Sequence, residues 1–154
     1  MKKFLFCLLF ISQIVVANGD SDQLSTFTLP SGIRVNIVEA SFSKVMFKVE
    51  LCKGSEDSVC LIDGKIPHGT SGGAPNTYLK ELAIEYKGAA YRLDTSSMFN
   101  AWGGRPLGYP GSIRYFGGFC YDEKNCAVRG IFSDGGGSFV AEWVVVGGVS
   151  ERTV

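Results

Sequence analysis

The single histidine of the chain, His68, is the side chain best suited to act as a general base near neutral pH. It lies three residues before Ser71, which stands inside residues 69–73 (GTSGG). That string matches the Gly-x-Ser-x-Gly pattern of a hydrolase nucleophile, but such a serine needs a strand directly before it and a helix directly after it. The neighbouring residues predict neither element. We therefore expect no catalytic residue here and rank a secreted hydrolase last among the functions considered.

Paired carboxylates are the other side chains that could perform hydrolysis, as they do in glycosidases. The acidic residues spread widely enough to meet in a fold are Asp63, Asp94, Asp134 and Glu142. Nothing in their spacing selects a pair, and turns and surfaces are the usual places for such residues. Asp134 precedes three glycines, but the alternating oxygen ligands and terminal glutamate of a calcium loop are missing. The sequence thus predicts no enzyme, no metal and no cofactor.

Four of the five cysteines lie well beyond the N-terminal segment, at positions 52, 60, 120 and 126. An even number in an exported chain predicts two disulfides, and four cysteines allow three pairings. We favour Cys52 with Cys60 and Cys120 with Cys126, because each pair flanks a short polar segment. Loops of these lengths stabilise a fold by roughly 2.6 and 2.4 kcal/mol. A four-cysteine zinc site is the alternative, but its ligand pairs are normally two to four residues apart.

A second group of residues favours recognition over catalysis. Residues 98–110 (MFNAWGGRPLGYP) combine Trp, Arg and Tyr, which are enriched at interface hot spots, with glycine-flanked backbone. A second long Gly- and Pro-containing loop, residues 63–76, contains the histidine, and loops of this length are often functional. The predicted interface residues are Phe99, Asn100, Trp102, Arg105, Tyr109 and His68. The alternative is that Phe99 and Trp102 fold back to cover the core.

The elements that must position these loops read as β-strands, because apolar and polar residues alternate with a period of two. The predicted strands are 24–29, 33–39, 44–51, 77–86, 90–95, 112–116, 127–132, 139–146 and 149–154. Segment 77–86 also fits a helical stripe, so a short helix is the alternative there. Trp143 shares a strand face with Phe139 and Val145, and we expect it in the core. The pattern predicts an all-β fold, mainly antiparallel, as a sandwich or an open barrel.

The N-terminal residues predict export. Lys2 and Lys3 precede an apolar run, residues 4–17, which is the layout of a secretory signal peptide. The run is shorter than the roughly 20 residues that span a bilayer, so we expect cleavage after Ala17 and no membrane anchor. Residues 18–154 then form a single β-rich domain, periplasmic or secreted. It carries 13 basic and 15 acidic side chains, which gives no field to attract nucleic acid.

Three blocks of the sequence resemble a known class of protein. They are residues 63–73 (DGKIPHGTSGG), 97–103 (SMFNAWG) and 132–143 (FSDGGGSFVAEW), and they are similar to small exported bacterial proteins. Some of those proteins resemble periplasmic immunity proteins of type VI secretion toxin systems. The resemblance implies a non-enzymatic protein that plugs the active site of a cell-wall-degrading toxin, often with a protruding loop. It assigns no functional residue to this chain.

Together these features predict a periplasmic binding or inhibitor protein. Its partner would be a protein, such as a secreted amidase-type toxin, contacted through residues 98–111 and 63–76. The alternative is an envelope carbohydrate-binding module that stacks sugars on Phe99, Trp102 and Tyr109.

Overall fold

The computed structural model describes residues 22–101, 112–133 and 137–154, and these residues form an all-β protein, as the alternation predicts. The predicted signal peptide, residues 1–17, lies outside the described residues. Within the described ranges no helix has the length and apolar character needed to cross a bilayer. The elements are β1 (Gln23–Thr28), β2 (Arg34–Ser41), β3 (Val49–Leu51), β4 (Val59–Ile62), β5 (Thr77–Tyr86), β6 (Ala89–Leu93), the 3₁₀ helix η1 (Ser112–Tyr115), β7 (Phe116–Asp122), β8 (Asn125–Phe132), β9 (Phe139–Val146) and β10 (Val149–Arg152).

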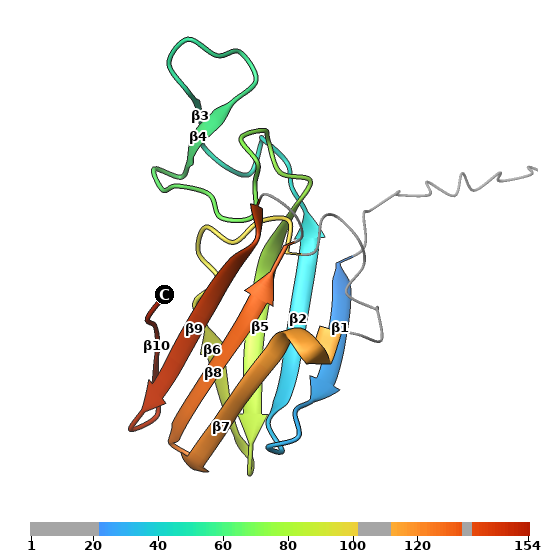
Figure 1. Ribbon diagram of the computed structural model, residues 1–154, viewed down its shortest axis with the longest axis vertical. Coiled ribbons are helices and arrows are strands. Elements are labelled where there is room, and N and C mark those ends of the chain that lie inside the picture. The colour runs from blue at the N-terminus through green and yellow to red at the C-terminus, as the bar shows by residue number, and fades with distance from the viewer. Residues whose placement is uncertain (1–21, 102–111, 134–136) are drawn as a thin grey trace, which may run out of the picture.

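Two four-stranded antiparallel sheets make up most of the fold. One has the strand order β1-β2-β5-β6 and the other has the order β10-β9-β8-β7, while β3 and β4 pair separately. The two large sheets lie one over the other (Figure 1), and side chains from both enter one buried cluster. The structure is thus an antiparallel β-sandwich, one of the two architectures expected from the sequence.

The core lies between the sheets and follows the alternation of the strands. Strand β9 turns Ala141, Trp143 and Val145 inward, and Trp143 is only 1% exposed, which confirms that it is a core residue. The Trp143 ring meets that of Phe132 edge-on, with centroids 6.0 Å apart. At Gly130 in β8, an added Cβ would lie 2.7 Å from the Phe132 ring. The aromatic packing therefore requires glycine at that position.

The two ends of the sandwich differ in their connections. At what we call the hairpin end, short turns join β1 to β2, β5 to β6, β7 to β8 and β9 to β10. The two-residue turns 87–88 and 147–148 have positive φ at both central residues, as tight hairpins require. At the opposite end, which we call the loop end, lie the longer connections (Figure 1), of which the structure describes residues 42–76, 94–101, 133 and 137–138. The long connections are therefore gathered at one end of the molecule.

The predicted strand 44–51 is wrong over its first half. Strand β3 begins only at Val49, and Val45 is 96% exposed in a turn. The cause is aromatic packing: Phe42 and Phe47 stack with ring centroids 4.9 Å apart, and the chain must turn between them. Contact between two distant rings thus overrides the local alternation.

The predicted strand 112–116 is also wrong, because η1 occupies most of it and the strand begins at Phe116. Strand β7 continues through residues 117–118, two glycines that offer no side chain to either face and so hide the strand from a pattern of alternation. Strand β4 was not predicted either. It is a short strand that pairs with β3 next to a disulfide.

Segment 77–86 is a strand throughout, and the alternative of a short helix is wrong. It pairs with β2 on one side and β6 on the other. A bulge between Val38 and Glu39 shifts the register, so that Leu79 and Leu82 both point inward although they are three residues apart. That spacing is what gives the segment its helical appearance in the sequence.

Candidate binding surface at the loop end

A two-stranded hairpin stands out from the loop end (Figure 1). It is built from β3 and β4, and we call residues 42–62 the arm. The base of the arm is held by a small apolar cluster separate from the main core. Phe99, 3% exposed, lies at its centre, and its ring centroid is 5.8 Å from those of both Phe42 and Phe47. The arm is therefore packed onto the sandwich.

Hydrogen bonds also fix the arm to the loop that follows it. Lys48 N donates to Asp63 Oδ1, and Asp63 N donates to Lys48 O, both at 2.8 Å. Further along, Val59 N donates to Gly72 O at 2.6 Å. Because these bonds join backbone to backbone or to a short side chain, they fix the direction in which the arm points.

The tip of the arm is closed by the Cys52–Cys60 disulfide, which confirms the favoured pairing. Inside the ring, Cys52 N donates to Ser58 O at 2.8 Å and Ser58 N donates to Ser55 Oγ at 3.0 Å. The exposed residues of the tip are Leu51, Lys53, Gly54, Glu56, Asp57 and Cys60. The tip thus offers two carboxylates and one ammonium group on a cross-linked loop that has little conformational entropy to lose on binding.

A cavity of about 290 Å³ opens beside the base of the arm. Its walls combine aromatic rings with charged and hydroxyl side chains. A site of this volume lies at the small end of the range for ligand pockets and matches one inserted side chain. The lining residues are Phe47, Ile62, Asp63, Lys65, Tyr78, Leu79, Lys80, Thr95, Ser96, Ser97, Met98 and Phe99.

Close backbone contact at Gly69 joins the loops of this end. Gly69 has φ +85°, and an added Cβ would lie 1.9 Å from Phe99 O and 3.2 Å from the Phe139 ring. On the other side, a Cβ at Gly137 would lie 3.1 Å from the Gly69 carbonyl carbon. Glycine is therefore required where the 63–76 loop passes between the Phe99 backbone and β9.

The buried carboxyl of Glu39 holds the ends of two of these loops. Glu39 is 1% exposed, and its Oε1 accepts hydrogen bonds from Thr77 Oγ1 and from Ala101 N, the latter at 3.2 Å. Its Oε2 is also buried and makes no hydrogen bond to any residue that the structure describes. Burial raises the pKa of Glu39 above its ordinary 4.5, and the hydrogen bonds from Thr77 and Ala101 only partly oppose that shift.

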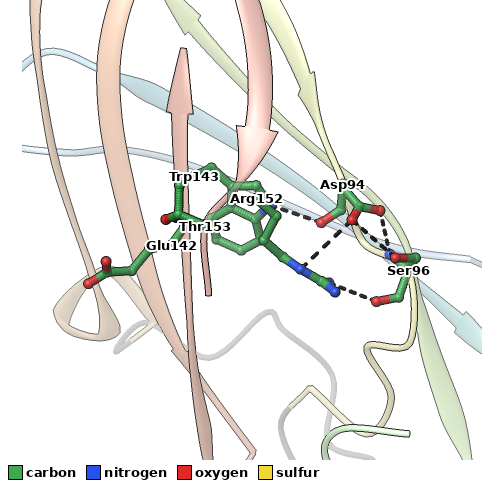
Figure 2. Close-up of polar contacts among 6 residues, drawn as sticks. All are labelled: Asp94, Ser96, Glu142, Trp143, Arg152 and Thr153. Atoms are coloured by element: carbon green, nitrogen blue, oxygen red, sulfur yellow. Dashed lines mark hydrogen bonds and ion pairs between the residues drawn. The ribbon is translucent and has the colours of Figure 1, made fainter. Parts of the chain in front are cut away.

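Below the loops, a polar cluster ties the two sheets together at the β6–β10 edge (Figure 2). Trp143 Nε1 donates to Asp94 O at 2.9 Å, and Arg152 Nη1 donates to Ser96 O at 2.7 Å. Arg152 Nε also lies 3.8 Å from Asp94 Oδ2. Partial burial tends to raise the pKa of Asp94, but the Ser96 backbone and hydroxyl hydrogen bonds and the charge of Arg152 outweigh it and hold that pKa below its usual value.

His68 is exposed, and its ring lies 5.5 Å from that of Phe139, centroid to centroid. Desolvation, and then the charge of Arg152, lowers the pKa of His68 below its ordinary value, which favours the neutral imidazole. No hydrogen bond joins it to the Ser71 hydroxyl in the described part of the chain. Residues 69–73 have neither a strand directly before them nor a helix after them, so the local structure of a nucleophile elbow is absent from this segment.

The predicted interface residues have different locations. Phe99 is buried under the arm and exposes only 3% of its surface to a sugar or protein; it packs in the small cluster at the base of the arm rather than over the main core. Asn100 joins two loops, since its Oδ1 accepts from Asn76 N at 2.8 Å and Thr77 N at 3.2 Å. His68 is exposed on the loop end. Trp102, Arg105 and Tyr109 lie outside the described residues, as does Asp134.

The acidic tip of the arm is the feature that sequence reasoning missed. Residues 53–58 read only as a polar turn between two cysteines, and the projection of the arm depends on contacts with Phe99 and Tyr78, more than fifteen residues away in the chain. A run of charges enclosed by a short disulfide was the one signal available.

The second disulfide, Cys120–Cys126, closes the β7–β8 turn at the hairpin end, so each end of the molecule carries one. Two disulfides indicate an oxidising, extracytoplasmic compartment. Across residues 22–101, 112–133 and 137–154, no cluster of three or more His, Cys, Asp or Glu side chains could hold a metal ion.

The comparisons with known proteins give no relative. No protein-family model, curated protein or solved structure matches this chain.

Proposed function

We propose that this protein is a periplasmic inhibitor that binds an enzyme through its loop end and blocks the active site with the arm. The enzyme would be a cell-wall-degrading toxin of amidase type, and the protein would confer immunity to it. The observation that carries the proposal is the arm itself, a disulfide-closed hairpin that projects from a packed base. A rigid projection loses little entropy on binding and can enter a cleft that a flat sheet face cannot.

The charges of the tip suggest how the arm would be recognised. Glu56 and Asp57 are exposed within the disulfide ring, and Lys53 is the one cation beside them. Carboxylates held on a rigid loop would pair with basic groups at the mouth of an enzyme cleft and speed the encounter. The cavity beside the base of the arm would accept a side chain of the same partner.

The mature chain, used as bait on periplasmic extract, tests the proposal. We expect it to retain one protein in equimolar amount, and that protein should hydrolyse peptidoglycan until the chain is added back. The variant Asp57→Lys should weaken inhibition by at least tenfold, whereas Glu123→Lys, which reverses a carboxylate charge at the hairpin end, should leave it unchanged. Retention on peptidoglycan without any protein partner would instead favour a carbohydrate-binding module.

A further inference from the structure

The outer faces of the two sheets differ sharply in polarity. On β1-β2-β5-β6 the outer side chains bond to one another: Thr26 Oγ1 donates to Asn36 Oδ1 at 2.9 Å, and Asn36 Nδ2 donates to Glu85 Oε1 at 2.8 Å. On β10-β9-β8-β7, the burial pattern and the strand register show that most of the side chains facing outward are apolar. The exposed large apolar residues on these strands are Phe119, Tyr121, Ile131, Val140, Val146 and Val149. Exposed apolar side chains gathered on one sheet face can mark an interaction site.

Glycine at position 117 leaves a hollow in this face. The hollow, about 410 Å³, is lined by Gly117, Phe119, Arg129 and Glu142 among others. Its neighbour Gly118 is required by packing, because a Cβ there would lie 2.8 Å from Ala127 O. Packing does not require glycine at position 117, because a Cβ there would meet only Arg129 Nε at 3.9 Å and the φ of Gly117 is not left-handed. A strand glycine without an internal reason often marks the close approach of another molecule.

Two opposite charges border the hollow. Arg129 and Glu142 are cross-strand neighbours in the β8–β9 register, yet neither side chain forms an ion pair or hydrogen bond with another described residue. Figure 2 shows the Glu142 side chain directed away from the Asp94–Arg152 cluster. The Arg129 cation next to the Glu142 anion is complementary to the same pair in a second copy turned by a two-fold axis. Glu151 of β10 is a further exposed carboxylate on this face.

From these features we infer that a second copy of this chain packs on the outer face of β10-β9-β8-β7. Phe119, 50% exposed at the rim, enters the hollow that Gly117 leaves in the other copy. Arg129 of each copy faces Glu142 of the other, so both unpaired charges are neutralised as the apolar side chains are buried. The contact is sheet on sheet, and it leaves both loop ends free, so it is independent of the proposed inhibitor function.

Sedimentation velocity of the mature chain, residues 18–154, tests the inference over a range of concentrations. The wild-type chain should sediment as a dimer. Gly117→Val places a side chain in the hollow, so this variant should sediment as a monomer. Because valine favours strands, its melting temperature should equal or exceed that of the monomeric charge variants Arg129→Glu and Glu142→Arg. Gly73→Val is the control, because Gly73 lies in the 63–76 loop, an added Cβ there meets no atom within 4 Å, and its φ is not left-handed. This variant should remain dimeric.

Charge exchange identifies the surface. Arg129→Glu and Glu142→Arg should each weaken the dimer by at least tenfold, and the double variant should restore it, because the opposite charges again face each other. A wild-type chain that stays monomeric at every concentration would overturn the inference. So would a dimer that Gly117→Val and both charge variants leave intact, since it would then use another surface.

Discussion

At the scale of single residues, Gly69 controls how closely the loops of the loop end can pack. Replacing it with alanine would place a methyl group 1.9 Å from Phe99 O at a φ of +85°. We predict that Gly69→Ala lowers the free energy of unfolding by about 3 kcal/mol, as measured by urea denaturation. Gly72→Ala is the matched control: its φ is +100° but no atom lies within 4 Å, so only backbone strain of about 1 kcal/mol is expected. Equal losses for both variants would contradict the close approach.

The carboxyl of Glu39 should make stability depend on pH. Because burial raises its pKa in the folded state, the folded protein binds the proton more tightly than the unfolded chain does. Its contribution to stability is therefore fully present below pH 4.5 and is lost as the pH rises through the folded pKa. Each unit of that shift corresponds to about 1.4 kcal/mol.

The variant Glu39→Gln tests this prediction, because the amide oxygen can still accept from Thr77 and Ala101 but cannot ionise. We expect the difference in unfolding free energy, variant minus wild type, to increase as the pH is raised from about 4 to about 8, a range that starts near the ordinary carboxyl pKa. A difference that stays constant across that series would show that Glu39 titrates alike in both states.

At the scale of elements, the two disulfides should have separate effects. Cys126 is 4% exposed and belongs to the main core, so Cys120→Ala with Cys126→Ala should lower global stability by about 2 kcal/mol. The Cys52–Cys60 ring lies at the tip of the arm and contributes no residue to that core. Its removal should raise amide exchange in residues 51–60 and change the melting of the sandwich less. Identical melting temperatures for the two double variants would be evidence against this division.

The sequence predicts those elements whose side chains alternate and whose turns are tight. Strands β8 and β9 and the Gly147–Gly148 turn follow from local pattern, because one face of each strand is buried along its length. Strand β7 was not predictable from the alternation of side chains, because Gly117 and Gly118 have no side chain that would mark the buried face. The arm was not predictable either, because its fold depends on Phe99, which is distant in sequence.

The candidate site was only partly predictable for the same reason. The pairing of Cys52 with Cys60 follows from spacing, and the 63–76 loop is a recognisable long connection. Which side chains of a loop point outward depends on tertiary contacts. Phe99 is an aromatic residue, a type often found at interfaces, but it is buried against the arm. Asp57 is of a type common in surface turns, and it is exposed at the tip.

At the scale of the whole molecule, the two ends of the sandwich carry different kinds of connection. The hairpin end consists of short turns, with the Cys120–Cys126 disulfide closing one of them, while the loop end holds the arm and the long connections. The β6–β10 edge is closed by Trp143 and Arg152, so the frame beneath the loops is fixed. A rigid frame with projecting loops at one end is well suited to hold an inserted segment in a partner's cleft.

Amide hydrogen exchange of residues 18–154, free and saturated with any protein that the proposed capture from periplasmic extract retains, tests this account most directly. If the loop end is the binding surface, residues 42–76 should become protected on binding, while turns 87–88 and 147–148 should exchange at unchanged rates. Protection confined to the hairpin end, with residues 42–76 unaffected, would contradict the account.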